Sequence, residues 1–435
     1  MKKNITKYLL LALACLGLQS CLFQEENYFD DSSANRATAD VSRCGELLKG
    51  APNGWVMEYY VGKDYSLGGI TLLCRFDGQR VIMASQMSEA DETVSSLYSV
   101  KSEQATMLSF DTYNYLVHYF GQPQGSMSDD PNGTLGGDYE FIISSASAER
   151  IELKGKKYGN RIVMKALTED QTWKQYLTKI KKVEDDAFFY EYDLLMDGLY
   201  TGQMIRSNYT FIVTYYDEIG KVHQKTVPFM FTADGLRFHE PVTIDGQTMQ
   251  NFVWKNELIS FVCTDEGATG VKLAGVYTAG YQSYDYYPGT YQMDFYRLND
   301  ETGQLEVASQ EVRLLKNEDG KSYWLKGLEY DILVMYDKPR GGLSVSPQLL
   351  EKVQGGYVYL AMWDVMNDYV LRSESIGLIS YATTNGIYLV DNGVWMGEVS
   401  GFIFGVYNSQ EEDAAFIGYT DAFASIRLVK KTIEE

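Results

Sequence analysis

Cysteine and histidine are both scarce in this chain of 435 residues, which holds 5 cysteines and 3 histidines. The cysteines beyond residue 21 are Cys44, Cys74 and Cys263, and their spacing fits neither a metal site nor a redox motif. A framework of several disulfides is therefore excluded. One bridge between Cys44 and Cys74 could form in an oxidising compartment, but three buried free thiols are the favoured interpretation. The histidines lie in separate segments, so no metal site and no cofactor is expected.

Basic residues are also few, because 38 lysines and arginines face 59 aspartates and glutamates, a formal net charge of −21. A protein that binds a polyanion needs a basic patch. The nearest approach to one is Lys154–Lys157 with Arg161, which lies in a strand-turn-strand pattern and is interpreted as a solvated hairpin tip. Nucleic acid and anionic lipid headgroups are therefore not expected as partners.

Long apolar runs are absent except at the N-terminus. The run Tyr8–Leu18 follows three lysines within residues 1–7, is too short for a membrane span of about 20 residues, and ends at Leu18-Gln19-Ser20-Cys21. This order predicts a signal peptide over residues 1–20. The last four residues resemble the lipobox of bacterial lipoproteins, in which the cysteine is acylated. Cys21 is therefore predicted to anchor the chain in a membrane through fatty acyl chains such as palmitate, the alternative being an ordinary secreted protein cut nearby.

Residues 21–36 lack hydrophobic periodicity and are predicted to form a flexible tether. Beyond them, apolar and polar residues alternate in short runs bounded by turn dipeptides such as Asp77-Gly78 and Asn385-Gly386. This pattern predicts a mainly β protein whose antiparallel meanders form two or three sandwich-like or barrel-like units. Short helices are expected chiefly at 37–49 and at 168–182, the second started by a capping box from Thr168 to Gln171.

Three domains follow from this reading. They are an N-terminal β-rich domain with two flanking helices at 37–182, a middle β-domain at 183–270 and a C-terminal barrel or sandwich at 271–435. A loop rich in glycine, proline and aspartate is predicted at 122–137. The polar cluster Asp111–Asn114 with His118 is interpreted as the cap of a short helix.

Motifs of hydrolases and nucleotide-binding proteins are missing. The chain contains no His-Glu-x-x-His, Gly-x-Ser-x-Gly or phosphate-binding glycine loop. Two acidic turns, Asn299–Gly303 and Asn317–Gly320, only loosely resemble calcium loops and are interpreted as β-turns. No catalytic or metal-ligating residue is predicted. A glycosidase stays an alternative because its two carboxylates leave no spacing signature in a sequence.

Tyrosine is abundant, with 35 residues, and it gathers in the segment Tyr277–Tyr291. A loop with this many aromatic rings could stack on sugars or on peptide side chains. The candidate ligand-binding residues are Tyr281, Tyr284, Tyr286 and Tyr287. For Tyr284, Tyr286 and Tyr287, the competing interpretation that the rings face the β-core has equal weight. Tyr291 is assigned to the core.

Several short motifs resemble an uncharacterised family of Bacteroidota lipoproteins. They are Gly54-Trp55-x-x-Glu58-Tyr59-Tyr60, Gly68-Gly69, Leu108–Asn114, His118, Gly137–Phe141, Leu153–Lys157 and Gly235-Leu236-x-Phe238-x-x-Pro241. Members of that family are typically encoded beside outer-membrane transporter and surface-lipoprotein pairs for nutrient uptake. The resemblance implies an outer-membrane, surface-exposed, non-catalytic binding accessory for glycan or peptide uptake. Acidic residues shortly after Cys21 agree with surface display. A glycan- or peptide-cleaving surface enzyme is the alternative.

Overall fold

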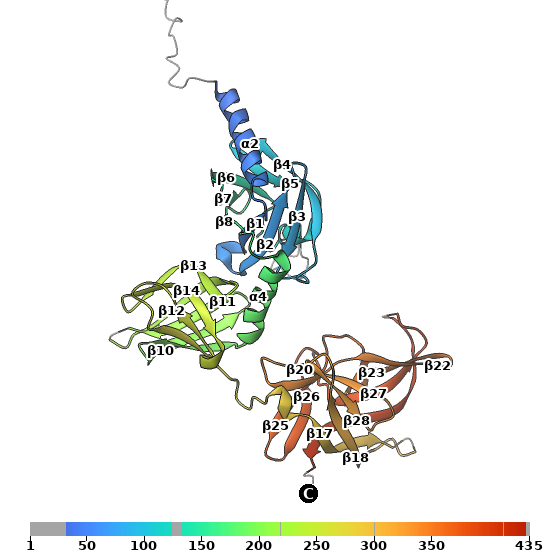
Figure 1. Ribbon diagram of the computed structural model, residues 1–435. Helices are drawn as coiled ribbons and strands as arrows, with labels where there is room; N and C mark the ends of the chain where they lie inside the picture. The colour runs from blue at the N-terminus through green and yellow to red at the C-terminus, as the bar shows by residue number, and fades with distance from the viewer. Residues whose placement is uncertain (1–31, 124–132, 218, 300, 412, 432–435) are drawn as a thin grey trace, which may run out of the picture.

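The protein is mainly β and consists of three antiparallel units that follow one another along the chain (Figure 1). This computed structural model describes residues 32–123, 133–217, 219–299, 301–411 and 413–431. The mainly β fold class predicted from period-two alternation is confirmed. The predicted signal peptide, Cys21, most of the tether and the centre of the 122–137 loop lie outside the described residues.

The first unit is a closed barrel in which each strand pairs with the next and β8 returns to β1. Its strands are β1 Trp55–Val61, β2 Gly68–Phe76, β3 Arg80–Ser85, β4 Val94–Ser102, β5 Thr106–Phe110, β6 Glu140–Ala146, β7 Arg150–Gly155 and β8 Arg161–Ala166. The predicted Asp77-Gly78 hairpin joins β2 to β3 and is confirmed. Helix α3, Tyr115–Gly121, starts at the predicted cap, where the Asn114 side chain accepts from Leu116 N.

Helix α2, Ser33–Lys49, begins earlier than predicted and takes up the last residues of the supposed tether. The reason is Ser32, whose side chain accepts a hydrogen bond from Asn35 N and so caps the first turn. The helix buries Cys44 and Leu48, and the Trp55 indole donates to Leu48 O at 2.9 Å. The end of the helix is thereby fixed to the first barrel.

Helix α4, Trp173–Asp186, starts after the predicted position, so the capping box assigned to Thr168 is wrong. The actual box joins Thr172 and Gln175, which repeat the same threonine-x-x-glutamine spacing. The Asn53 side chain explains the choice, because it donates to Thr168 O at 2.7 Å and to Gln171 O at 2.8 Å. These bonds hold the preceding segment against the barrel in a non-helical form.

The second unit is another closed barrel, with β9 paired to both β10 and β16. Its strands are β9 Glu191–Met196, β10 Leu199–Ser207, β11 Thr210–Tyr216, β12 Val222–Phe231, β13 Gly235–Ile244, β14 Gln247–Lys255, β15 Ser260–Cys263 and β16 Val271–Val276. The predicted boundary at 271 assigned the residues of strand β16 to the third domain. The strand instead pairs with β9 from Val271↔Met196 to Val276↔Glu191 and closes the second barrel, a pairing that local sequence patterns cannot indicate.

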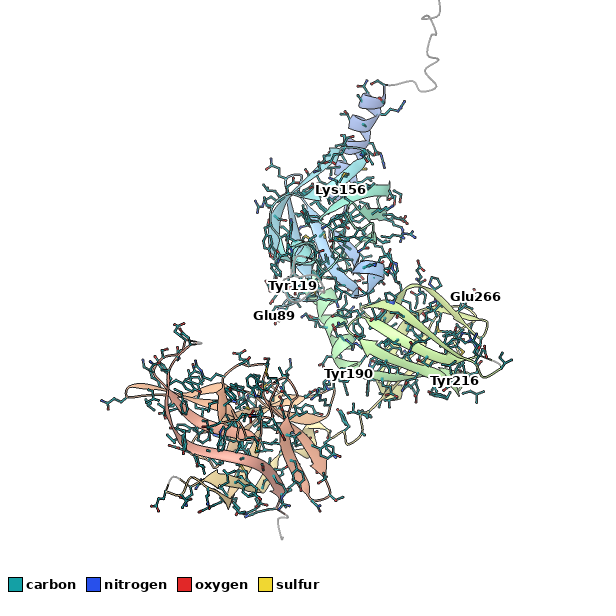
Figure 2. All side chains as sticks on the ribbon, turned by 180° about the vertical axis from the view of Figure 1, so that it is seen from behind. Glu89, Tyr119, Lys156, Tyr190, Tyr216 and Glu266 are labelled. Atoms are coloured by element: carbon teal, nitrogen blue, oxygen red, sulfur yellow. The ribbon has the colours of Figure 1, made fainter. Side chains whose placement is uncertain are left out.

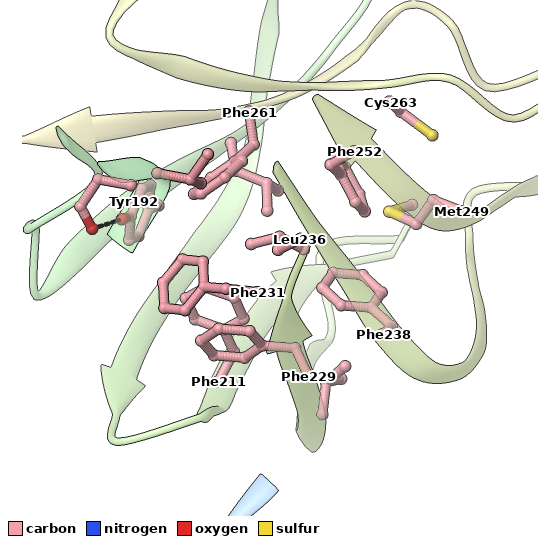
Figure 3. Packing of buried hydrophobic residues seen from close by; sticks show 14 of the residues in the cluster. Tyr192, Phe211, Phe229, Phe231, Leu236, Phe238, Met249, Phe252, Phe261 and Cys263 are labelled. Carbon is pink, nitrogen blue, oxygen red and sulfur yellow. Dashed lines mark hydrogen bonds between the residues drawn. The ribbon is translucent and has the colours of Figure 1, made fainter. Parts of the chain in front are cut away.

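Phenylalanines fill the second barrel (Figure 3). Phe211 and Phe229 stack with ring centroids 4.4 Å apart, and the Tyr192 hydroxyl donates to Ala187 O at 2.8 Å. The same cluster contains Val56, Leu73 and Ala84 of the first barrel together with the buried face of α4, Leu177, Ile180 and Val183. The first two barrels therefore share one continuous core.

The third unit is a 12-stranded sheet in which β17 pairs with β18 and also with β28, so that part of the sheet closes into a ring. Its strands are β17 Gly289–Leu298, β18 Leu305–Lys316, β19 Ser322–Lys326, β20 Ile332–Asp337, β21 Gly342–Val345, β22 Gln348–Val353, β23 Gly356–Asp364, β24 Tyr369–Leu371, β25 Leu378–Thr383, β26 Gly386–Asp391, β27 Gly401–Tyr407 and β28 Phe416–Lys430. Lys338 of this unit bonds Asp185 of α4 at 2.8 Å.

Cys44, Cys74 and Cys263 are buried and free, as predicted. Within the described residues, none of the helices is both long and apolar enough to cross a membrane. Several tyrosines occupy exposed strand positions, including Tyr216 at the end of β11 on the second barrel (Figure 2). This placement accounts for part of the high tyrosine content, because tyrosine suits half-buried strand faces.

Candidate ligand-binding site

The tyrosine segment selected from the sequence lies at the start of the third unit, where several of its rings enter the core. Tyr287 is only 1% exposed and its hydroxyl donates to Gly341 O at 2.8 Å. Tyr291 is buried as predicted and donates to Tyr287 O at 2.6 Å. Tyr284 is half-buried, donates to Ser322 O at 2.8 Å and stacks on Tyr323. These side chains pack against one another rather than facing solvent together.

Tyr281 and Tyr286 complete the predicted set. Tyr281 is half-buried and stacks on Phe188, and its hydroxyl accepts from the Tyr336 hydroxyl at 3.2 Å. Tyr286 is the one clearly exposed ring of the four, at 39%, and Lys430 Nζ lies 5.2 Å from its centroid. A recognition loop requires the four rings to be exposed together, and Tyr287 does not meet this condition. Ligand binding by the other three stays a prediction.

A different group of side chains forms a row across the outer wall of the third unit. Strand register places Tyr381 opposite Tyr388, Tyr388 opposite Arg427, and Arg427 opposite Asp294. Residues directly opposite one another in antiparallel strands point to the same face. Ser309 extends the row by one strand beyond Asp294. We call these five residues the transverse row. At about 4.8 Å between strands, it spans about 19 Å.

A second, more apolar row runs beside the first. It pairs Ile379 with Val390 on β25 and β26, and Tyr296 with Val307 on β17 and β18. Between these two pairs, β28 contains a bulge, because its register against β17 shifts after Asp294 and Ser425 adopts a φ of 51°. Pairing of β26 with β28 also ends at Tyr388. The wall therefore opens at this point.

The opening is a hollow of about 690 Å³, which we call the bulge hollow. Four buried apolar residues also border it, namely Phe295, Leu389, Val399 and Ile426, whose side chains belong to the core of the unit. Its other lining residues include members of both rows and the polar side chains Asp391, Glu398, Ser400 and Ser425. The hollow thus combines apolar surface from the second row, at Tyr296, Val307 and Val390, with polar groups, which is the usual composition of a small-ligand site.

An ion pair crosses the hollow between β28 and β17. Arg427 Nη2 bonds Asp294 Oδ2 at 2.7 Å. Hydrogen bonding to Asp294 raises the pKa of Arg427, and contact with Tyr388 adds to this effect. A guanidinium carries five N–H donors, so Arg427 keeps donors for a ligand while Asp294 supplies acceptor oxygens next to them. A neighbouring donor and acceptor of this kind can bind two adjacent hydroxyl groups.

The segment between β26 and β27 brings Glu398 to the hollow, and buried Asp364 fixes its position. Asp364 Oδ2 accepts from the Trp395 indole at 3.1 Å and from Glu398 N at 3.4 Å. Hydrogen bonding, first of all from Asn367, keeps the pKa of Asp364 below its usual value. Asp391 holds the same segment by accepting from Val399 N at 3.2 Å. The rim of the hollow is therefore ordered by the fold before any ligand arrives.

This arrangement suits sugar rings better than ions. Tyr388 and Tyr296 offer aromatic surface, the second row offers apolar surface, and the ion pair offers paired donors and acceptors. Among the described residues, no group of three or more histidine, cysteine, aspartate or glutamate side chains is placed to hold a metal ion.

Sequence reasoning missed the transverse row because its members come from strands far apart in the chain. Alternation along β26 does predict that Tyr388 and Val390 share one face of the strand. Nothing local indicates that Arg427 and Asp294 lie beside them, since that depends on β28 pairing with both β26 and β17.

Two family models match the chain. One, described as "Domain of unknown function (DUF4302)", matches residues 25–256, and the other, described as "Domain of unknown function" (DUF4987), matches residues 264–404. No curated protein matches. Among solved structures, a mutant of transferrin binding protein B from Haemophilus parasuis, a vaccine antigen, is 11% identical over 87% of this chain and 75% of that chain, with a TM-score of 0.14.

Proposed function

The chain belongs to the family described as domain of unknown function DUF4302, and from that premise we propose that it is a cell-surface lipoprotein that binds glycans without cleaving them. In this role it serves as an accessory of an outer-membrane uptake system. The family description supplies no chemistry, so the proposal rests on the third unit and on the N-terminal sequence.

The observation that carries the binding role is the bulge hollow with its two rows of side chains. Sugar rings have apolar faces that stack on tyrosine and hydroxyl groups that need both donors and acceptors. The hollow offers Tyr388 and Tyr296 for the first purpose and the Arg427–Asp294 pair for the second. A row of about 19 Å can hold more than one sugar ring, which favours an oligosaccharide over a single sugar.

The binding role can be tested with an array of oligosaccharides followed by calorimetric titration of the best ligand. Tyr388→Ala and Tyr296→Ala are each expected to weaken binding about tenfold, since a stacked ring contributes about 1.4 kcal/mol. Tyr216→Ala removes an exposed tyrosine of the second barrel and should leave affinity unchanged. If Tyr286→Ala abolishes binding while Tyr388→Ala does not, the site lies in the Tyr281–Tyr287 segment instead.

The same samples separate a binder from a glycan-cleaving enzyme. A binder leaves the oligosaccharide intact, so no new reducing ends should appear after prolonged incubation. Release of reducing ends that is lost on replacing Glu398 or Asp391 with the corresponding amide would contradict the non-catalytic role, because glycoside cleavage depends on a pair of carboxyl groups.

Anchoring at Cys21 is the second part of the proposal. The basic first residues, the short apolar run and the order Leu18-Gln19-Ser20-Cys21 support it. Cys21→Ala is expected to move the protein from the membrane pellet to the soluble fraction, because the acyl chains supply the membrane affinity. Cys15→Ala, inside the predicted signal peptide, is the matched control and should leave the protein in the pellet. Retention of the Cys21 variant after high-salt washing would contradict the lipid anchor.

A further inference from the structure

A second pocket lies between the first two barrels, within the residues that the DUF4302 model matches. It has a volume of about 520 Å³, and we call it the interbarrel cleft. The first barrel contributes side chains from β1, β7 and β8, and the second contributes them from β13 and β14. The two barrels share a buried core, so the walls of the cleft are held in place by the packing beneath them.

Aromatic rings from both barrels meet in the cleft. His239 of β13 lies against Tyr60 and Tyr65, with ring centroids 4.3 Å and 4.0 Å away. Burial lowers the pKa of His239, and the nearby guanidinium groups of Arg161 and Arg237 lower it further, against an opposing effect of Glu240. The imidazole is therefore neutral at pH 7, and these three rings form an uncharged aromatic surface.

Cations outnumber carboxylates around these rings, which is unusual in a chain with a net charge of −21. Glu58 is bonded both to Lys165, at 2.8 Å, and to Arg237. Glu152 of β7 is likewise shared by two cations, Arg150 and Arg161. Glu240 is the third carboxylate at the site. Four cationic side chains thus face three carboxylates, leaving one positive charge in excess.

Arg150 and Arg161 are the accessible cations of the cleft, with side chains 43% and 63% exposed. Arg150 uses Nε and Nη2 to bond one oxygen of Glu152, at 3.1 Å and 3.0 Å. Arg161 Nη2 bonds the same oxygen at 3.2 Å. Each guanidinium has five N–H groups, so both keep donors that can face the cleft. A guanidinium fork matches the geometry of a planar carboxylate.

From this geometry we propose that the interbarrel cleft binds a sugar that carries one carboxylate, such as a hexuronic acid. The carboxylate bonds Arg150 and Arg161, and the ring lies against Tyr65 and His239. The single excess positive charge favours a monoanion over a doubly charged phosphate. That the carboxylate is carried by a sugar rests on the proposed glycan-binding function, but the site is separate from the bulge hollow.

The test is a calorimetric titration of the intact folded chain with galacturonic acid, galactose and galactose 6-phosphate. Galacturonic acid is expected to bind at least tenfold more tightly than either of the other two, and its affinity should fall as salt is added, because the contact is electrostatic. Failure of the folded protein to bind galacturonic acid, or tighter binding of the phosphate ester, overturns the proposal.

Variants locate the site. Replacing Arg150 and Arg161 together with glutamine should reduce galacturonic acid affinity at least tenfold. The control, Arg313→Gln, removes an exposed arginine of the third unit and should change nothing, so an equal loss there would point to bulk charge and overturn the proposal. The Arg150 and Arg161 double variant should also keep its affinity for the neutral oligosaccharide that the bulge hollow binds. That comparison distinguishes failure of this proposal from failure of the bulge hollow.

Discussion

Replacing Glu58 with alanine is expected to lower the free energy of unfolding of the first two barrels by about 3 kcal/mol. Glu58 is buried and pairs with Arg237 across the interbarrel cleft and with Lys165 on its own barrel. Its removal leaves the largely buried Arg237 guanidinium without a counter-charge, which costs more than the pair itself contributes. Lys165 is exposed enough to be rehydrated. Differential scanning calorimetry of the whole chain measures the effect on the transition of these two barrels.

Glu152→Ala is the matched control for this prediction. Glu152 also pairs with two cations, but both of those arginines are exposed, so its loss should cost less than about 1 kcal/mol. Replacing Glu58 and Arg237 together with methionine should recover most of the stability, because well-packed apolar residues often substitute for a buried ion pair. Equal, small losses for Glu58→Ala and Glu152→Ala would show that the pair does not stabilise the junction of the barrels.

Tyr287→Ala is expected to destabilise the third unit by about 3–5 kcal/mol. The substitution removes a buried ring and leaves Gly341 O without the hydroxyl that donates to it at 2.8 Å. The neighbouring Tyr286 is the control, because its ring is exposed and the change to alanine there should cost no more than about 0.5 kcal/mol. The measurement is the same calorimetric scan, read at the transition of the third unit.

A larger loss of stability for Tyr286→Ala than for Tyr287→Ala would show that Tyr287 is exposed. That result would support the recognition loop predicted from the sequence. Equal losses for both would show that the whole segment is structural. The two stability predictions can be tested independently, because Glu58→Ala affects the unfolding of the first two barrels and Tyr287→Ala affects the unfolding of the third unit.

Much of the fold follows from local pattern. Alternating runs located most strands, and the dipeptide Asp77-Gly78 located a hairpin, because turn chemistry and strand period act over a few residues. Where two nearby segments fit the same motif, the sequence alone could not show which of them forms it. Thr168 and Thr172 both begin a threonine-x-x-glutamine box, and bonds from the distant Asn53 side chain select the second.

Pairing between distant strands was beyond local prediction. Strand β16 fits either the second or the third unit by its pattern, and only its register with β9 decides. The same limit applies to the candidate site, where Tyr388, Arg427 and Asp294 become neighbours through β28. The tyrosine segment shows the converse, because a sequence with many rings does not reveal that the hydroxyl of Tyr287 has a buried carbonyl as its partner.

The most direct test of the central claim is a crystal structure of the protein with the oligosaccharide that binds it most tightly. We expect sugar density in the bulge hollow, with one ring stacked on Tyr388 or Tyr296 and hydroxyl groups bonded to Arg427 and Asp294. Density confined to the Tyr281–Tyr286 segment, or a hollow that stays empty in crystals where the ligand occupies another surface, would contradict the claim.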